Sequence, residues 1–469
     1  MVNRMNEIII RNGLIVNSNN RVNSDIRILD EKIQEIGANL SKSQDSSQEI
    51  DAKNLVILPG GIDPHVHLSL PDYVPSEFRW SDNFESGSKA ALAGGITTLG
   101  CISVPDKNET PLGTIKRESQ SIHQNAIADF IIHPVIFSPT EDIIREIPEL
   151  MKIGCNTIKI FMVTDDFDTN FLQYKKCIEV AKRADMLTMI HCEDNAIIKQ
   201  TTQDLISAGK GSLKNYADSR PVASEVIATK KAVEIAKDLG ASIYIVHLSS
   251  KAALEICQQA QTDILPVYVE GRPIFLYFTR KEYQRPDGAI FVVQPPLREQ
   301  KDLDALWNGI ANGSIHTLAT DHAPHTRDQK LNPDLDISKL VPGINELQVM
   351  LPVFYSKAVQ SKKITLERFV ELTSTNAAKL FGLYPRKGTI QIGSDADLVL
   401  WDFKETRIIK DEDMFSQAGF SIYNGESYTG WPKMTIRRGQ IVYQDQKIIA
   451  ELGTGKVIPR NQTRRLVKK

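Results

Sequence analysis

The chain has 469 residues, of which 41% are hydrophobic and 24% charged, and its net charge is −2. This size allows one large α/β barrel with an accessory domain, or two to three ordinary domains, and the near-zero charge gives no electrostatic case for a nucleic-acid or anionic-membrane partner. The five cysteines are scattered, the N-terminus has no signal-peptide pattern and no apolar run approaches about 20 residues, so we expect reduced thiols in a cytoplasmic protein without a membrane span.

Two stretches near the N-terminus predict a small β unit. Residues 7–16 and 24–37 alternate apolar and polar side chains, with turns between them. After a polar loop at residues 41–47, residues 55–58 form an apolar run that ends at Pro59 and Gly60. A short apolar run bounded in this way is typical of a buried strand, and we expect the chain to enter its large domain here.

From this point a short apolar run, a polar tip and a helical pattern follow one another repeatedly. The apolar runs lie at residues 56–67, 96–104, 129–136, 157–163, 186–192, 242–248, 263–269 and 315–320. The helical patterns lie at residues 83–93, 114–127, 141–153, 170–183, 224–239, 252–261 and 303–312. Eight strands with helices between them predict an α/β fold, a (β/α)8 TIM-like barrel. The alternative is a doubly wound open sheet, but no Gly-x-Gly-x-x-Gly fingerprint follows the first strand.

The remaining chain contains two helical segments and then returns to strands. The helical segments are residues 346–358 and 366–383, and the strands are residues 389–392, 396–402, 435–438 and 440–443. We expect these strands to pair with the N-terminal ones, so that a small β domain is built from both chain ends. The predicted domains are therefore residues 1–57 with 384–469, and a barrel of residues 58–383.

Polar side chains that suit a metal centre fall at the carboxyl ends of five predicted barrel strands. They are His65 and His67 on the first strand, Lys159 on the fourth, His191 on the fifth, His247 on the sixth and Asp321 on the eighth. A single histidine at a strand end is usually an ordinary core or rim residue. Six such residues that all face one mouth of a barrel instead predict a metal site, because imidazole and carboxylate groups are metal ligands.

Lys159 fits such a site only if it is not an ordinary cation, because an ammonium group would repel divalent ions. Burial lowers the pKa of a lysine, and a neutral amine adds carbon dioxide to give an anionic carbamate with two oxygens. We therefore expect a carbamylated Lys159 to bridge two divalent metals. His65, His67 and Asp321 would hold one metal, and His191 and His247 the other. These ligands suit zinc best, and manganese, iron or cobalt would also fit.

The chain resembles the amidohydrolase superfamily, and within it the cyclic amidohydrolases. Pro-Gly-Gly-Ile-Asp-Pro-His-Val-His (residues 59–67), residues 82–95, residues 392–402 and Gly-Thr-Gly-Lys-Val-Ile-Pro-Arg (residues 453–460) resemble the hydantoinase/dihydropyrimidinase branch. Ala-Thr-Asp-His-Ala-Pro-His-Thr (residues 319–326) is more similar to dihydroorotases, and Pro-Pro-Leu-Arg (residues 295–298) to both. The resemblance implies the same metal ligands, including the carbamylated lysine. Related enzymes are commonly tetramers, so it also implies a homo-oligomer, a dimer or a homotetramer.

The implied reaction is hydrolysis of the C–N bond of a cyclic amide, a small-molecule substrate, by a hydroxide that the two metals activate. Asp321 would take the proton of the nucleophile and deliver it to the leaving nitrogen. Asn345, in a Gly-Ile-Asn stretch, matches a substrate-binding Asn of the hydantoinases. We expect the main chain around Gln294 to contact the ring as well.

Several positions differ from the related families, so the sequence allows more than one substrate ring. Dihydroorotases have an Arg where this chain has Ser69 and an Asn where it has Asp106, and these two residues bind the substrate carboxylate in that family. Hydantoinases have a Tyr where this chain has Thr164, and His325 or a water would have to replace that donor. The alternatives are dihydroorotase or allantoinase, or a non-catalytic dihydropyrimidinase-like scaffold. The kept metal ligands argue against the scaffold.

Overall fold

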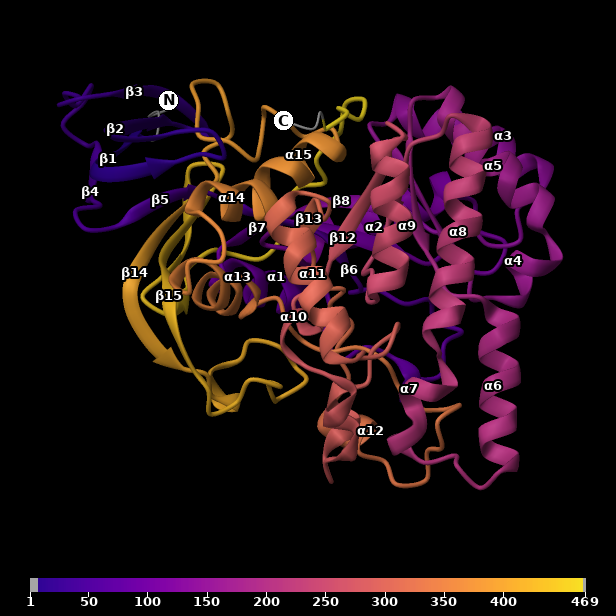
Figure 1. Cartoon of the computed structure of the whole chain (residues 1–469). Helices are drawn as coiled ribbons and strands as arrows, with labels where there is room; N and C mark the ends of the chain where they lie inside the picture. The colour runs from indigo at the N-terminus through magenta and orange to yellow at the C-terminus, as the bar shows by residue number, and fades with distance from the viewer. Residues whose placement is uncertain (1–6, 467–469) are drawn as a thin grey trace.

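The computed structural model describes residues 7–466, and its centre is a closed barrel of eight parallel strands (Figure 1). The strands are β6 (Gly61–Val66), β7 (Ile96–Ser103), β8 (Asp129–Pro134), β9 (Thr157–Phe161), β10 (Leu187–His191), β11 (Ile243–Ile245), β12 (Val267–Gly271) and β13 (Thr317–Leu318). Strands β6 to β8 and β9 to β13 form two continuous parallel sheets. Bridges from Val135 to Lys159 and from Val66 to His322 join these sheets into a ring. The predicted barrel is confirmed, and the open-sheet alternative is wrong.

Helices surround the barrel and cover the outer faces of its strands (Figure 1). The longer ones are α1 (Phe84–Ala93), α2 (Pro111–Asn125), α3 (Glu141–Lys152), α5 (Phe171–Arg183), α6 (Asn195–Ser207), α8 (Val222–Leu239), α9 (Lys251–Thr262) and α11 (Gln300–Asn312). Shorter ones are α4 (Asp165–Thr169), α7 (Tyr216–Ser219), α10 (Ile274–Tyr277), α12 (Arg327–Lys330), α13 (Met350–Phe354), α14 (Leu366–Val370) and α15 (Asn376–Leu380). Side-chain caps fix several starts: Thr140, for example, accepts a hydrogen bond from the main-chain N of Ile143.

A second sheet is assembled from both ends of the chain, as predicted. Its strands are β1 (Glu7–Val16), β2 (Arg21–Leu29), β3 (Lys32–Gly37), β4 (Gln48–Asp51), β5 (Val56–Pro59), β14 (Leu398–Ile408), β15 (Ser427–Arg437), β16 (Gln440–Gln444) and β17 (Lys447–Ile448). Strand β5 lies between β1 and β14 and so joins the two ends. Residues 1–6 and 467–469 of the predicted small domain lie outside the described residues, and its boundaries at residues 57 and 384 remain our proposal.

The structure differs from several local expectations. The run at residues 56–67 is two strands separated at Gly60, where a Cβ would lie 2.2 Å from the side-chain oxygen of Thr97. Residues 389–392 are not a strand, because the side chain of Asn17 supplies both hydrogen bonds to the main chain of Ile390. Helix α6 was not predicted at all. It buries only Asn195 and Ile198, so its sequence lacks a clear apolar stripe.

A buried ionic cluster connects the barrel with the second sheet. The Nζ of Lys387 lies 2.8 Å from Asp129 at the start of β8, 3.4 Å from Asp395 and in close contact with Asp397. Arg438, which follows β15, also binds Asp129 at 3.1 Å. Because Asp129 belongs to the barrel and its partners flank the second sheet, these ion pairs fix the two sheets against each other.

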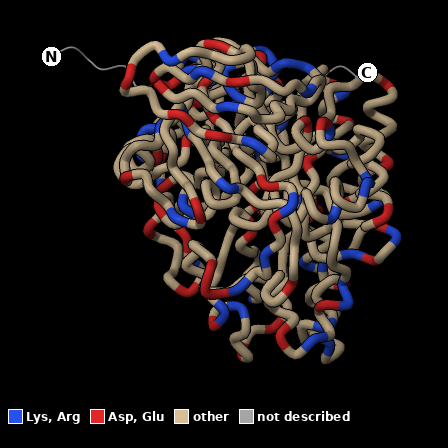
Figure 2. The backbone as a smooth tube through the Cα atoms, turned by 90° about the vertical axis from the view of Figure 1, so that its left-hand side faces the viewer, with Lys and Arg blue, Asp and Glu red and all other residues tan. Residues whose placement is uncertain are grey.

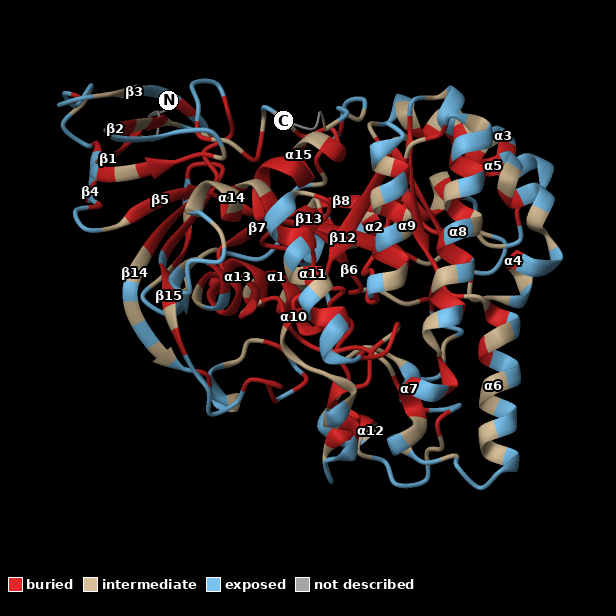
Figure 3. Cartoon of the chain, viewed as in Figure 1, coloured by how far each residue is buried: buried red, intermediate tan, exposed pale blue. Residues whose placement is uncertain are grey.

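Burial follows the layers, while charge does not concentrate on any one side. The barrel strands are buried and the outward faces of the helices are exposed (Figure 3). Basic and acidic segments are interspersed over the molecule (Figure 2). No helix in the described range is long and apolar enough to cross a membrane.

Candidate metal centre

The six predicted ligands are all buried, and each lies in the second half of a barrel strand, at its middle residue or just after its carboxyl end. Strand β6 ends beside His65 and His67, β9 carries Lys159, and β10 ends at His191. The remaining two, His247 and Asp321, follow β11 and β13. The carboxyl ends of parallel barrel strands meet at one mouth, so the fold gathers side chains that are far apart in the chain.

One half of the centre is formed by His65, His67 and Asp321. The Oδ1 atom of Asp321 lies 3.3 Å from Nε2 of His65 and 3.0 Å from Nε2 of His67. One ligand atom from each residue lies within 4.8 Å of the others. Two imidazole nitrogens and a carboxylate oxygen at this separation can share one divalent ion.

The other half is formed by His191 and His247, whose Nδ1 and Nε2 atoms lie 3.1 Å apart. The Nε2 atom of His191 is bound by Glu193 at 2.8 Å, and Glu193 is bound in turn by Arg220. This carboxylate fixes the ring of His191 so that Nδ1 faces His247. The rings of His65 and His247 have centroids 5.4 Å apart, so the two halves are adjacent.

Lys159 is fully buried, and its Nζ atom has no hydrogen-bond partner. The Nζ atom lies 4.8 Å from the centre of the Phe161 ring. Burial lowers the pKa of Lys159 to about 8, because the charged form loses its hydration. A substantial fraction of this amine is therefore neutral near physiological pH, as carbamylation requires.

The donor set fits a bound metal. Two buried nitrogens of the candidate ligands have no hydrogen-bond partner and belong to the atoms assigned to the centre, namely Nε2 of His65 and Nζ of Lys159. Leaving a buried polar atom unpaired costs about 1–3 kcal/mol each, so two in one place need an explanation. Metal ions together with a carbamate on Lys159 would supply partners to this cluster.

Main-chain geometry at the centre is unusual. His247 has φ 36° and Asp321 has φ 48°, in the left-handed region that residues other than glycine rarely adopt. Asp63 helps to fix this arrangement, since its carboxylate binds the main chain of His65 at 3.1 Å and the hydroxyl of Thr320 at 2.6 Å. These bonds tie the first barrel strand to the eighth, on either side of the ring closure.

Sequence reasoning missed two charged residues at the end of the seventh strand, Glu270 in β12 and Arg272 directly after it. Glu270 accepts hydrogen bonds from the ring of His65 and from the main chain of His247. The side chain of Arg272 donates to the carboxylate and to the main-chain carbonyl of Asp321. The predicted strand ended at residue 269, one residue before Glu270. Because of this boundary error, Glu270 and Arg272 were not recognised as residues near the strand end.

The predicted substrate-binding segments come together, although their side chains have other partners. The main-chain N of Gly343 donates to the carbonyl of Val292 at 2.9 Å. Lys330 binds the carbonyls of Val292, Val341 and Gly343. The stretches that precede Gln294 and Asn345 are therefore held side by side.

Among the four predicted substrate-binding side chains, Asn345 and Thr164 make hydrogen bonds with other parts of the protein. Asn345 donates to the carbonyl of Phe420, while its own oxygen has no partner. Thr164 caps helix α4 by accepting from Phe167 N. The hydroxyl of Tyr216 donates to the carbonyl of Val293, next to Gln294, at 3.2 Å, and the buried Nδ1 atom of His325 has no hydrogen-bond partner.

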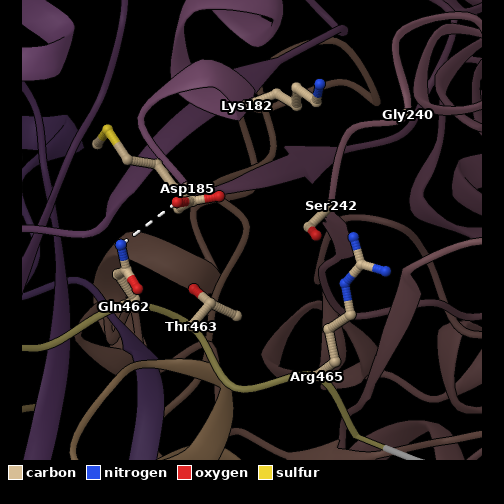
Figure 4. Close-up of a pocket in the computed structure, with 8 residues that line it drawn as sticks. Lys182, Asp185, Gly240, Ser242, Gln462, Thr463 and Arg465 are labelled. Atoms are coloured by element: carbon tan, nitrogen blue, oxygen red, sulfur yellow. Dashed lines mark hydrogen bonds between the residues drawn. The ribbon is translucent and has the colours of Figure 1, made fainter.

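A polar pocket lies at the opposite end of the barrel, near the starts of β10 and β11 (Figure 4). Lys182, Asp185, Ser242 and Arg465 line it, and Gln462 donates to Asp185 at 3.3 Å. Residues at this end of a TIM-like barrel usually serve stability. The candidate centre is therefore distinct from this pocket.

Comparisons with known proteins agree with this geometry. The model of the amidohydrolase family matches residues 56–442. A D-hydantoinase of Geobacillus stearothermophilus is 32% identical over 457 residues, which cover 96% of both chains. The D-hydantoinase (dihydropyrimidinase) of a Thermus species superposes with a TM-score of 0.92 at 31% identity, over 97% of this chain and 99% of that one. The dihydropyrimidinase of Brevibacillus agri superposes with a TM-score of 0.91 at 29% identity, over 98% and 100% of the two chains.

Proposed function

The chain belongs to the hydantoinase/dihydropyrimidinase branch of the amidohydrolase family, and from this premise we propose that it hydrolyses the ring amide bond of a small cyclic substrate. The observation that carries the proposal is that two histidines and one aspartate place ligand atoms within 4.8 Å of one another. Beside them lie a second pair of histidines and a buried lysine whose Nζ atom has no hydrogen-bond partner. This arrangement suits two divalent ions better than any protein-only hydrogen-bond network.

We propose that His65, His67 and Asp321 hold one divalent ion, that His191 and His247 hold the other, and that a carbamate on Lys159 bridges them. Zinc suits these ligands best, and manganese, iron or cobalt also fit. When bound, such ions lower the pKa of a water molecule toward about 7 and polarise a carbonyl group. The same ions would neutralise the charge that Asp321 and the carbamate bring into a buried site.

The protein's own part in the reaction is to move a proton and to orient the ring. Asp321 accepts a proton from the attacking water on a free lone pair of its carboxylate and returns it to the leaving ring nitrogen. Lys330 holds together the segments that precede Gln294 and Asn345, and we expect main-chain groups near these two residues to contact the ring edge. Burial of the centre excludes bulk water, which strengthens each of these polar contacts.

The residues near the mouth favour an uncharged ring. Ser69 donates to Glu118 at 2.8 Å, so the position that carries an Arg in dihydroorotases is here tied to an acid. Asp106 lies 3.5 Å from Arg117, which also binds Glu109 and Glu118. The cation nearest to these acids is therefore already neutralised by them. A substrate carboxylate at this place would lack a partner, and burying it unpaired is costly.

The test is a comparison of kcat/KM for dihydrouracil, hydantoin, allantoin and dihydroorotate, with zinc or manganese supplied. We expect dihydrouracil or hydantoin to be preferred, with modest rates, because Thr164 cannot supply the tyrosine hydroxyl of the hydantoinases. Loss of one such donor typically costs about 10²-fold or more in kcat. A clear preference for dihydroorotate would indicate a dihydroorotase, and a clear preference for allantoin an allantoinase, in place of the proposed function. Absence of turnover with absence of bound metal would favour the scaffold.

Two further properties are proposed. Self-association into a dimer or tetramer is supported by exposed apolar side chains on neighbouring helices, such as Leu172 at the start of α5 and Ile227 in α8. Light scattering on the purified protein measures the oligomeric state. The cytoplasm stays our proposed compartment on the pattern of the cysteines alone.

A further inference from the structure

The seventh barrel strand, β12, carries no candidate ligand, yet its end contacts candidate ligands in both halves of the centre. Glu270 and Arg272 flank Gly271, the last residue of β12, and both side chains contact candidate ligands. Both side chains are fully buried. We propose that Glu270 and Arg272 are positioning residues that hold the ligands in the arrangement a metal requires, an inference that rests on the proposed metal centre.

Glu270 connects one ligand from each half. Its Oε1 atom lies 2.9 Å from Nδ1 of His65 and accepts a hydrogen bond of 2.8 Å from the main-chain N of His247. Because Nδ1 of His65 is engaged in this way, Nε2 is left facing Asp321. The second bond stabilises the left-handed main chain of His247, which a residue with a side chain adopts only under constraint.

Arg272 grips Asp321 at two points. Its Nη1 atom donates to Oδ2 of Asp321 at 2.7 Å, and its Nη2 atom donates to the carbonyl oxygen of the same residue at 3.2 Å. One rigid guanidinium therefore fixes both the side chain and the left-handed main chain of Asp321. Oδ2 is taken by the arginine, and Oδ1 remains directed at His65 and His67.

The two possible effects of Arg272 on metal binding have opposite signs. A fixed positive charge near a divalent ion repels it and so weakens binding, whereas a fixed ligand geometry strengthens binding. Arg272→Gln removes both the positive charge and the pair of hydrogen bonds to Asp321. Arg272→Lys keeps the charge but loses this pair of hydrogen bonds, because an ammonium group lacks the planar, forked geometry of a guanidinium. Comparing the two variants therefore separates positioning from electrostatics.

The experiment is a titration of the metal-free full chain with Co²⁺, followed by its visible absorption spectrum, which reports ligand geometry without any turnover. We expect Arg272→Lys, Arg272→Gln and Glu270→Gln each to weaken Co²⁺ binding by about 10–100-fold, as the loss of groups that orient ligands typically does. Thermal unfolding without metal checks that each variant is folded. Arg437→Gln is the matched control: Arg437 is equally buried, but it binds the carbonyl of Ile127 and the side chain of Thr454.

The outcomes are distinct. If Arg272→Lys binds Co²⁺ as the wild type does and Arg272→Gln binds it more tightly, Arg272 acts through its charge and the positioning role is wrong. If Arg437→Gln loses as much affinity as the Arg272 variants, the loss is a general effect of removing a buried arginine, and the inference is again overturned. A wild-type chain that binds no Co²⁺ would overturn the proposed metal centre itself, and this inference with it.

Discussion

At the scale of single residues, Asp321 connects two candidate histidine ligands with Arg272. It contacts two histidines through one oxygen and Arg272 through the other. Asp321→Asn is expected to leave the barrel folded and to lower kcat by about 10²–10⁴-fold, because an amide cannot accept the proton. Activity and metal content should be measured on the same sample. Asp302→Asn, which changes a buried carboxylate at the start of α11, is the control. Near-wild-type kcat with full metal would refute the proton-transfer role.

Lys159 gives a prediction about pH. Its pKa is lowered by burial to about 8, from 10.5 for an ordinary lysine. Only the neutral amine adds carbon dioxide, so the carbamylation of metal-free protein should speed up as pH rises through about 8. At a fixed carbon dioxide pressure the rate should rise about tenfold between pH 7 and pH 9 and then level off. NMR with labelled carbon dioxide follows the adduct, and Lys159→Ala is the control. An increase of about a hundredfold without levelling would indicate an ordinary exposed lysine.

The sequence identified the six candidate ligands because His, Lys and Asp at strand ends are conspicuous residue types. It did not reveal what surrounds them. Arg272 contacts Asp321 across 49 positions of the chain, and Asn345 contacts Phe420 across 75. No periodicity encodes such pairs, because they depend on how loops of different length fold back over the mouth of the barrel.

At the scale of elements, the loop before Asn345 depends on one glycine. Gly343 has φ 121°, and a Cβ there would lie 2.0 Å from the carbonyl oxygen of Ala323. Gly343→Ala should displace the loop and lower kcat/KM by about 10²-fold, as misplacement of an orienting group by about 1 Å can do, while bound metal is retained. Gly240→Ala is the control, since Gly240 also has a positive φ but has nothing within 4 Å of its Cβ position. Equal effects of the two changes would mean that backbone strain alone is responsible.

Elements with a clear apolar pattern were predictable, and those without one were not. Strand β7 is buried along its whole length and was found almost residue for residue. Helix α6 packs weakly and was missed, and strand β12 was placed too early because the apolar residues Ile264 and Leu265 lie before it. The apolar periodicity used to predict elements arises from buried side chains, so an element that buries few residues has only a weak pattern in the sequence.

At the scale of the whole molecule, Lys387 holds the barrel and the second sheet together. Its ammonium is buried among three carboxylates, and those neighbours raise its pKa against the effect of burial. Lys387→Met should lower the free energy of unfolding by about 3–5 kcal/mol, because it leaves buried carboxylates without their cation. Denaturant unfolding measures this loss.

The matched control for this prediction is Lys32→Met. Lys32 binds the same Asp395 at 2.6 Å, but its side chain is 45% exposed, so its loss should cost less than about 1 kcal/mol. If the two substitutions cost the same, the cluster around Lys387 does not hold the two sheets together. The sequence predicted that both chain ends share a sheet, but it gave no sign of this cluster, whose members are individually ordinary.

The pairing of β5 with β14 can form only late in the synthesis of the chain. Leu398 pairs with Pro59 and lies roughly 340 residues later in the chain, so at about 5–20 residues per second it leaves the ribosome roughly 20–70 seconds after its partner. During that interval one edge of β5 has no neighbour, and an unpaired strand edge readily recruits other chains. A nascent chain of this protein therefore needs its barrel, or a chaperone, to shield the N-terminal strands until synthesis is nearly finished.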